Sequence, residues 1–406
     1  MSHDAKKEYL TRIRSRYSLA SKAEKKKILD EFCTVCSYNR KYAIRILRQP
    51  SFQENTTRQA IRGPKKQYDD PDLFKALKYF WRLTNLPCSK RLTAIIHLWL
   101  PYYPYYLSDH LKEKLLSISP ATIDRLMKPM RSRFNKLGLA TTKPGSILKK
   151  HIPVKTNQWE ETIPGFIEAD TLAHCGNSVT GMFVYTINCV DIATGWSAQR
   201  AVWGKGEQGV IAAIQNIEES LPFPILGFDC DNGSEFLNWH LYRHLSNRKQ
   251  PIQFTRSRAY HKNDNAHIEE KNWSHLRQYL GYQRFDDPQL VPLLNELYTS
   301  EWNSYFNFFI PSLKLINKLR LGSKTIKEYE KPNTPFQRLM QSNHSTQEAK
   351  EKLKSTFQTL NPFLLQKQMK SKIDHIINLV NDLENTQLLS NSVTPITTKS
   401  ENEIYA

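Results

Sequence analysis

The first part of the chain has the apolar spacing of short helices. Ser21 and Glu24 stand three residues apart ahead of an apolar run, which is the capping-box pattern that begins a helix. After a short break, the stretch RKYAIRILR over 40–48 puts its apolar residues on one side of a helix and its basic residues on the other. Two short helices, the second rich in arginine, predict a helix-turn-helix. A small helical hairpin with a solvated basic face is the alternative.

Helical patterns continue over 73–86 and 92–100, after a polar and basic linker. Ser119 followed by Pro120 is an N-cap with proline at the first helical position, so another helix begins there. These elements resemble a second helix-turn-helix unit. The basic stretch 131–155, which contains Gly and Pro, is predicted to be an extended linker that can lie along phosphates.

From Pro164 onward the pattern changes to strands that alternate with helices. Strands are expected at 165–172, as a hairpin over 181–203, and at 222–229 and 251–258. Helices are expected at 206–221, 236–244 and 264–282. This order predicts a mixed α/β sheet with helices on its faces.

The C-terminal part again has the spacing of amphipathic helices, over 345–385. Their apolar faces could pack on the core or on another subunit. The last residues, from Leu388 on, are expected to be disordered.

The charge of the chain is unevenly distributed. The net charge is +19, and residues 1–160 contain 33 Lys and Arg against 13 Asp and Glu. The remaining residues contain 25 basic and 26 acidic side chains, so they are close to neutral. A basic segment beside a neutral one favours a nucleic-acid-binding part attached to a part with another task. General basicity for solubility is the alternative, but it does not explain the asymmetry.

Membrane and secretory features are not expected. No apolar run approaches the length of a membrane span, and the first residues lack the apolar stretch of a secretory signal. Of the six cysteines, only Cys33 and Cys36 have metal-like spacing, and a lone C-x-x-C is a weak signal. We therefore expect a reduced cytoplasmic protein, associated with the nucleoid through its basic part.

Carboxylates cluster in the strand-rich part. Alternation along the strand 165–172 places Glu168 and Asp170 on one face, where charge is costly unless it is compensated. In the stretch FDCDNGSEF, Asp229 and Asp231 share a face, with Asp231 at the strand end. Glu235 stands at the following helix start, where a carboxylate meets the helix dipole favourably. Asp170 is therefore a candidate for chemistry, together with Asp229 or Asp231.

A third carboxylate is predicted from helical geometry in the segment 264–282. At about 100° per residue, Trp273, Leu276 and Leu280 lie within about 40° of Glu269. This places Glu269 on the axis of a buried stripe, whereas Glu270 should be solvated.

Two Asp from strands and one Glu from a helix make an oxygen-ligand site suited to Mg²⁺ or Mn²⁺. Two such ions would activate a water or 3′-hydroxyl and stabilise the leaving oxygen of a phosphodiester. The pair His174 and Cys175 could hold zinc, but no further ligand at usable spacing completes that site.

Together these residues resemble a known family. Asp170 in a first strand, DNGSEF from Asp231 and NAHIE ending at Glu269 are similar to the catalytic core of the DDE integrase/transposase superfamily, which includes bacterial insertion-sequence transposases and retroviral integrases. The segments 299–315 and 334–340 also resemble the post-catalytic part of bacterial insertion-sequence transposases. A retroviral-type N-terminal zinc module and a C-terminal β-barrel are not evident.

The resemblance implies an RNase H-like fold in which the first and fourth strands are adjacent, so that Asp170 and Asp231 meet. It implies two Mg²⁺ or Mn²⁺ ions held by Asp170, Asp231 and Glu269, and DNA strand cleavage followed by strand transfer. The implied partners are double-stranded DNA, as element ends and as target, and further copies of the chain. Asp229 would contribute at most secondarily to the carboxylate site, and Asp191 is predicted to form a turn.

The expected domains are a helix-turn-helix over 1–62, a second helical DNA-binding region with its linker over 63–150, an RNase H-like catalytic core with post-catalytic helices over 151–340, and a helical segment with a disordered tail over 341–406. Basic residues of the predicted helix 40–48, of the loop 256–263 and of the predicted helix 264–282 are the candidates for DNA contact. For the loop 256–263, a solvated surface loop without DNA contact is the alternative. The DNA-contact candidates are Arg40, Lys41, Arg45, Arg48, Arg256, Arg258, Lys262, Lys271 and Arg277.

Two other functions use the same features. An RNase H-like nuclease without joining activity needs the same carboxylates, but it does not need two helix-turn-helix units. A non-catalytic DNA-binding regulator derived from a transposase could have lost a carboxylate, and all three are present.

Overall fold

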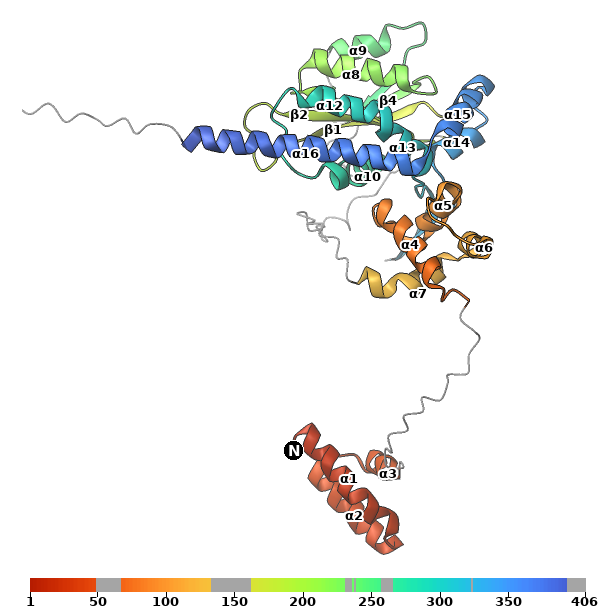
Figure 1. Cartoon of the computed structure of the whole chain (residues 1–406), viewed down its shortest axis with the longest axis vertical. Helices are drawn as coiled ribbons and strands as arrows, with labels where there is room; N and C mark the ends of the chain where they lie inside the picture. The colour runs from red at the N-terminus through yellow and green to blue at the C-terminus, as the bar shows by residue number, and fades with distance from the viewer. Residues whose placement is uncertain are drawn as a thin grey trace, which may run out of the picture. The chain divides into compact units, whose positions relative to one another are not determined.

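The computed structural model of the chain (Figure 1) divides into two compact units, Met1–Gln67 and Tyr68–Ala406. The structure describes residues 1–48, 67–132, 162–230, 236, 239–256, 266–322 and 324–392.

The first unit contains three helices, α1 (His3–Leu19), α2 (Lys22–Cys36) and α3 (Arg40–Arg48). The predicted capping box at the start of α2 is confirmed, because the Ser21 hydroxyl accepts from the Glu24 N–H while the Glu24 carboxylate accepts from the Ser21 N–H. Ser37, in a left-handed conformation, ends α2, and only three residues separate α2 from α3. The three helices enclose a small core of Ile13, Tyr17, Ile28, Leu29, Phe32, Cys36, Ala43, Ile46 and Leu47.

The second unit begins with four helices, α4 (Pro71–Leu83), α5 (Ser89–Trp99), α6 (Asp109–Ser117) and α7 (Pro120–Arg131). The Ser119 hydroxyl accepts from the Thr122 N–H, as the predicted N-cap requires. These helices pack against later parts of the chain: Arg91 donates to the Pro311 carbonyl at 2.8 Å and Trp99 to the Phe309 carbonyl at 3.1 Å. They share one hydrophobic core with the sheet that follows.

The sheet has five strands, β1 (Phe166–Ala173), β2 (Val184–Asp191), β3 (Ser197–Trp203), β4 (Gly227–Cys230) and β5 (Gln253–Arg256), in the order β3-β2-β1-β4-β5. β1, β2 and β3 pair antiparallel, whereas β1, β4 and β5 are parallel. The predicted mixed α/β sheet is confirmed, and so is the adjacency of the first and fourth strands. The order and the directions agree with the RNase H-like sheet implied by the resemblance.

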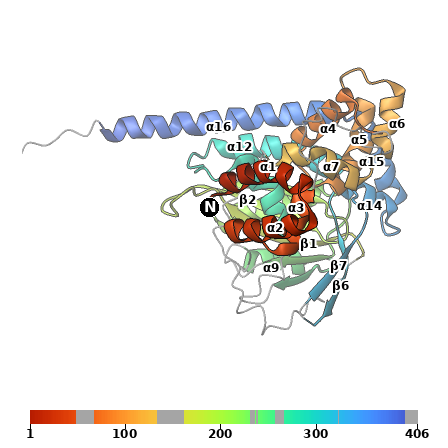
Figure 2. The ribbon, with the colours of Figure 1, turned by 90° about the horizontal axis from the view of Figure 1, so that it is seen from below.

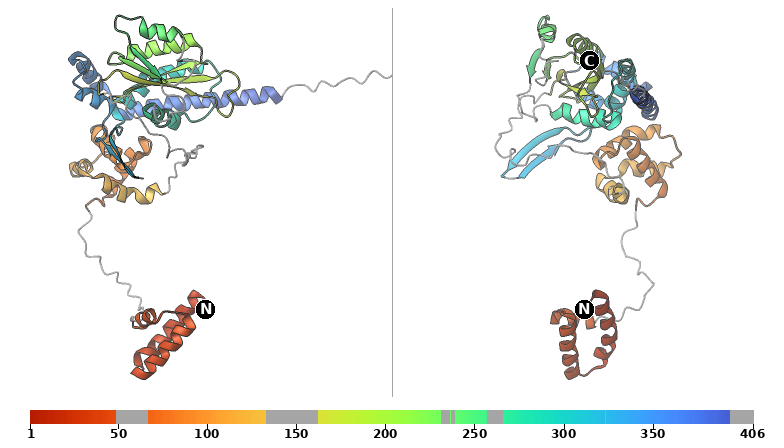
Figure 3. Two further views of the ribbon diagram at one scale, coloured as in Figure 1. Left: turned by 180° about the vertical axis from the view of Figure 1, so that it is seen from behind. Right: turned by 90° about the vertical axis from the view of Figure 1, so that its left-hand side faces the viewer.

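Helices cover the sheet on both sides (Figures 1 and 3). On one side lie α8 (Glu207–Ser220) and α9 (Trp239–Ser246). On the other lies a helical stretch of α10 (Ala266–Lys271), a π-helical segment (Asn272–Arg277) and α11 (Gln278–Leu280). This layering buries both faces of β2 and β3, whose residues are almost all inaccessible to solvent.

The rest of the chain adds helices and a hairpin. α12 (Leu290–Leu297), a π-helical turn (Tyr298–Trp302) and α13 (Asn303–Phe309) place aromatic residues in the core. They are followed by β6 (Leu315–Leu321) and β7 (Lys324–Tyr329), then by α14 (Pro335–Gln341), α15 (Gln347–Thr359) and the long α16 (Pro362–Ser392) (Figure 2). The two-stranded sheet of β6 and β7 was not predicted from the sequence.

α16 extends to Ser392, so residues 388–392 of the expected disordered tail are helical, and the residues after them lie outside the described part. All six cysteines are free thiols. Within the described ranges, no helix combines the length and the apolar character that crossing a bilayer requires.

Candidate active site

Asp170 lies in the second half of β1, half-buried, opposite Asn188 of β2. Its Oδ1 accepts from the Thr171 N–H at 2.8 Å, and its Oδ2 accepts from the Asn272 side-chain amide at 2.7 Å. Asn272 begins the π-helical segment that follows α10. The carboxylate is therefore held in one orientation by its own strand and by the helix that crosses it.

A chain of three buried amides stands behind Asp170. Gln199 donates to the Asn188 side-chain oxygen at 2.9 Å, and Asn188 donates to the Asn272 side-chain oxygen at 2.8 Å. Each amide accepts through its oxygen and donates through its nitrogen, so the Asn272 amide group must present its nitrogen to Asp170. Sequence reasoning missed these three residues, although the amides of Asn188 and Gln199 inside otherwise apolar strands were a usable signal.

Glu168 connects the same strand to the start of α10. It is buried, and its Oε2 accepts from the Ile268 N–H at 3.0 Å. The first N–H groups of a helix have no partner within the helix, so a buried carboxylate satisfies one of them and interacts favourably with the helix dipole. Sequence reasoning placed Glu168 on the Asp170 face but gave it no role.

Asp229 is the partner of Glu168 across the parallel β1–β4 pair. It is buried, and its Oδ1 accepts from the Thr255 hydroxyl of β5 at 2.6 Å. This contact links β4 to β5.

Asp231 lies outside the described residues, as do Arg258 and Lys262. The described part of β4 ends at Cys230, which pairs with Ala169. Asp170 directly follows Ala169 in the sequence, and Asp231 directly follows Cys230. Arg256 ends β5, where it pairs with Cys230.

Glu269 is exposed on α10, and so is Glu270. The predicted solvation of Glu270 is confirmed, but the buried stripe around Glu269 is wrong, since the Trp273 side chain is 42% exposed. This helical stretch buries Leu276 and Leu280, as predicted, together with Ile268, Lys271, Asn272 and His275. Three of these six are polar, so hydrophobicity alone could not identify the face. The π-helical segment, with its i→i+5 bonding, also shifts the phase of Leu276 and Leu280.

Lys271 does not lie on the polar side of the helix, contrary to prediction. Its side chain is buried, with Nζ at 3.2 Å from His275 Nε2, and burial lowers the pKa of Lys271 to about 8. The His275 ring stacks on Phe306, and burial lowers the pKa of His275 well below its ordinary value.

Arg277 is half-buried and is used within the fold. It donates to the Ala173 carbonyl at 2.8 Å and to the Gly281 carbonyl at 3.3 Å, and its guanidinium lies over the Tyr282 ring. Burial lowers the pKa of Arg277. These contacts fasten the helix end to β1.

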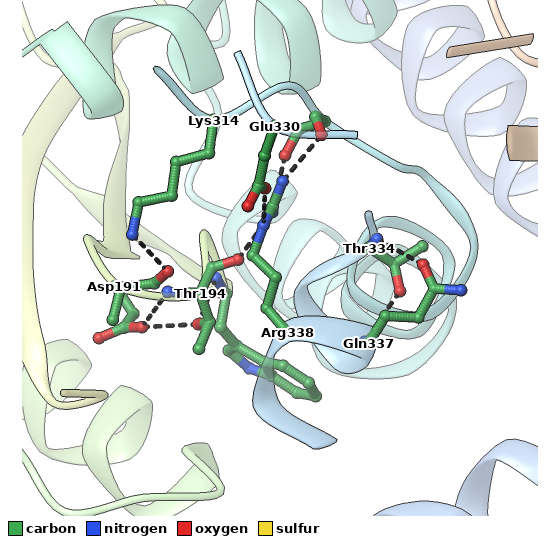
Figure 4. Close-up of polar contacts among 10 residues, drawn as sticks. Asp191, Thr194, Lys314, Glu330, Thr334, Gln337 and Arg338 are labelled. Atoms are coloured by element: carbon green, nitrogen blue, oxygen red, sulfur yellow. Dashed lines mark hydrogen bonds and ion pairs between the residues drawn. The ribbon is translucent and has the colours of Figure 1, made fainter. Parts of the chain in front are cut away.

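Asp191 forms a turn, as predicted. It is buried in the β2–β3 connection, where it accepts from the Gly165 and Thr194 N–H groups, each at 2.8 Å, and from the Thr194 hydroxyl at 2.6 Å (Figure 4). It is committed to backbone donors at the opposite end of β1 from Asp170, because it pairs with Ile167.

His174 is also structural. It is completely buried, its ring stacks on Phe285, and its Nε2 lies 2.8 Å from the Thr186 hydroxyl, which in turn contacts Tyr298. Burial lowers the pKa of His174 to about 3, so the ring is neutral.

In the first unit, the four basic candidates of α3 are all exposed. Arg40 pairs with Asp30 of α2, and the Arg45 guanidinium lies over the Tyr42 ring. Ala43, Ile46 and Leu47 form the buried side of α3, and Tyr42, expected on that side, is 40% exposed.

The donor set suits a hard cation. No group of three or more His, Cys, Asp or Glu residues converges as a metal site among the residues that the structure describes, and Asp231 is not one of them. Asp170 and Glu269 provide carboxylate oxygens, and Asp170 is pre-oriented by the Asn272 amide. Such oxygens are the ligands that Mg²⁺ and Mn²⁺ prefer.

Several known proteins are similar to the chain, although no protein-family model matches it. The integrase catalytic core of HTLV-2, solved with magnesium, gives a TM-score of 0.27 at 14% identity, over 37% of this chain and 91% of that one. The catalytic core of BIV integrase gives 0.27 at 15% identity, over 44% and 96%. The simian T-cell lymphotropic virus intasome, solved with a PP2A regulatory subunit, gives 0.31 at 15% identity, over 58% and 72%. These TM-scores are too low for the likeness to decide fold or function.

A sequence relative is much closer. The chain is 36% identical to the uncharacterized protein y4rM of Sinorhizobium fredii over 342 residues. The matched residues cover 82% of this chain and 94% of y4rM. The chain belongs to the same protein family as y4rM.

Proposed function

We propose that the chain is a metal-dependent DNA transposase of the integrase type, which cleaves DNA at element ends and transfers the cut strand to target DNA. One observation carries this proposal. The parallel β1–β4 pairing ends, in the described residues, with Ala169 beside Cys230, directly before Asp170 and Asp231 in the sequence. The helix that contains Glu269 is tied to the same strand through Glu168 and Asn272.

Asp170, Asp231 and Glu269 would hold two Mg²⁺ or Mn²⁺ ions. When bound, such ions would activate a water or 3′-hydroxyl and would stabilise the leaving oxygen. The protein's own contribution is positioning: Asn272 orients the Asp170 carboxylate, and Glu168 holds the start of α10 against β1. Glu269 lies three residues before Asn272, and residues three apart on a helix are neighbours on its surface. Glu269 would therefore lie near the Asn272 side chain that bonds to Asp170.

DNA would be bound by the first unit and near the site. Arg40, Lys41, Arg45 and Arg48 are exposed on α3, and the three residues between α2 and α3 agree with a helix-turn-helix connection. Arg256, Arg258 and Lys262 immediately precede the catalytic helix in the sequence and would contact phosphates there. Double-stranded DNA ends, target DNA and further copies of the chain are the proposed partners.

The test is a cleavage assay on DNA that flanks the gene, with Mg²⁺ or Mn²⁺. Wild type, Asp170→Asn and Asp231→Asn are compared on a denaturing gel, with a chelator lane for each. We expect the wild type to nick at a defined 3′ end and to give strand-transfer products, and each variant to lose both while it still binds DNA. Nicking without transfer would favour a nuclease, and tight binding without cleavage by any protein would favour a regulator.

A further inference from the structure

The β6–β7 hairpin projects from the body of the second unit (Figures 2 and 3). Every described residue of β7 is exposed, and so are the residues of β6 whose side chains are described. An isolated two-stranded hairpin is at best marginally stable in water, because neither face is covered. A hairpin of this kind is therefore more easily explained by a surface that it contacts than by a role in the core.

The base of the hairpin is fixed firmly to the sheet (Figure 4). Buried Arg338 donates to Glu330 at 2.5 Å, to the Ser312 carbonyl at 2.8 Å and to the Thr194 carbonyl at 2.9 Å. Lys314 donates to the Ala193 carbonyl at 2.7 Å. Arg338 therefore connects both ends of the hairpin to the β2–β3 turn, and Lys314 connects the first end to it. The hairpin thus has a defined direction relative to the sheet.

The register separates two faces. On one face the cross-strand pairs are Asn317–Glu328, Leu319–Ile326 and Leu321–Lys324. Only one of these three pairs is wholly apolar, although Leu319, Leu321 and Ile326 are all exposed on this face. A second copy of the chain is therefore the competing occupant of the hairpin.

The other face is basic. Arg320 pairs with Thr325, and Lys327, two residues further along β7, has Lys318 as its cross-strand partner. Arg320 and Lys327 are both exposed, so this face presents two positive charges to a polyanion.

Within residues 161–406, the hairpin is a basic segment among otherwise acidic sequence. Residues 314–331 contain six Lys and Arg against two Asp and Glu. The other residues from 161 to 406 contain 19 basic and 24 acidic side chains. In this part of the chain the excess of positive charge therefore lies on the hairpin and its two ends.

We propose that the basic face of the β6–β7 hairpin, carried by Arg320 and Lys327, binds the phosphate backbone of double-stranded DNA. A two-stranded ribbon has the size that the major groove admits, and Lys and Arg contacts to phosphates supply sequence-independent affinity. The choice of DNA as the polyanion rests on the proposed function.

The test compares two full-length double variants that change the net charge equally. Arg320→Glu with Lys327→Glu alters the hairpin, and Lys352→Glu with Lys354→Glu alters exposed lysines of α15. Affinity for a duplex is measured by fluorescence anisotropy at several salt concentrations. Loss of two phosphate contacts should lower the slope of log affinity against log salt by about 1.8 and weaken binding at least about 10-fold at moderate salt.

The control variant should keep the wild-type slope. An unchanged slope in the hairpin variant would overturn the proposal, as would an equal change in the control. Loss of self-association in sedimentation, with DNA binding intact, would assign the hairpin to a second copy and also overturn it. DNA binding can be measured without cleavage. If the hairpin variant has a lower slope of log affinity against log salt and the wild type never cuts DNA, the proposed function would be wrong and the hairpin proposal would be supported.

Discussion

Asn272 gives Asp170 its orientation, and its own orientation comes from Asn188. Replacement by alanine leaves Asp170 and Asn188 each without one hydrogen-bond partner, which typically costs about 1–3 kcal/mol for a buried polar group. If Asp170 holds a metal ion, Asn272→Ala should also reduce metal affinity or activity by about 10- to 100-fold, as loss of a supporting hydrogen bond at a metal ligand does. The measurement is cleavage rate against Mg²⁺ concentration.

Asn307 offers a matched control for that experiment. Its buried amide bonds twice to the Ser197 backbone, at 2.8 and 2.9 Å, and touches no candidate ligand. Asn307→Ala should lose comparable stability but keep the wild-type Mg²⁺ dependence. The positioning role of Asn272 would be refuted by equal Mg²⁺ dependence in the two variants at a temperature where both are folded.

His174 makes the stability of the fold sensitive to acid. Its pKa falls from 6.5 to about 3 on burial, so below about pH 6.5 the unfolded chain binds the proton that the folded chain refuses. The free energy of unfolding should therefore fall as the pH drops through that window. His174 alone contributes about 2 kcal/mol of loss between about pH 7 and about pH 5.

His174→Gln removes the titratable imidazole and keeps a side chain that can form a hydrogen bond with the Thr186 hydroxyl. Denaturant unfolding at the two pH values should show a pH-dependent loss smaller by about 2 kcal/mol than in the wild type. The same loss in both proteins would mean that another group carries the acid sensitivity.

At the scale of elements, apolar periodicity predicted the helices and strands that bury an apolar face. The five sheet strands and helices α2 to α5, α7 and α8 lie where the pattern placed them, within a few residues at their ends. The adjacency of β1 and β4 came from the family resemblance rather than from periodicity.

Two elements were beyond such reasoning, for different reasons. The helical stretch that begins with α10 buries Lys271, Asn272 and His275, which a hydrophobic pattern predicts to face solvent. The β6–β7 hairpin has no buried face at all, so its alternation of Leu and Lys residues gave no signal of a core. Both depend on contacts with distant segments, such as β1 for the helix and the β2–β3 turn for the hairpin.

At the scale of the whole molecule, we propose that α3 and the β6–β7 hairpin bind DNA and that the carboxylates carry out the chemistry. The first unit presents the basic helix α3, and the second unit contains the carboxylates and the hairpin. Changes in α3 or in the hairpin should therefore alter affinity for DNA, whereas changes in the carboxylates should abolish cleavage and leave affinity nearly unchanged.

The central claim is that Glu269 belongs to the catalytic carboxylates, and α10 provides its own control. Glu269 and Glu270 are adjacent, identical in chemistry and both exposed, and Glu270 Oε2 lies 3.9 Å from Lys271 Nζ. The folding of Glu269→Gln and of Glu270→Gln is therefore compared with the wild type by thermal unfolding. The decisive measurement is Mn²⁺-dependent nicking of the flanking DNA by the two variants beside the wild type. We predict that Glu269→Gln abolishes nicking with binding retained, while Glu270→Gln nicks as the wild type does. Nicking by Glu269→Gln at the wild-type rate would contradict the account.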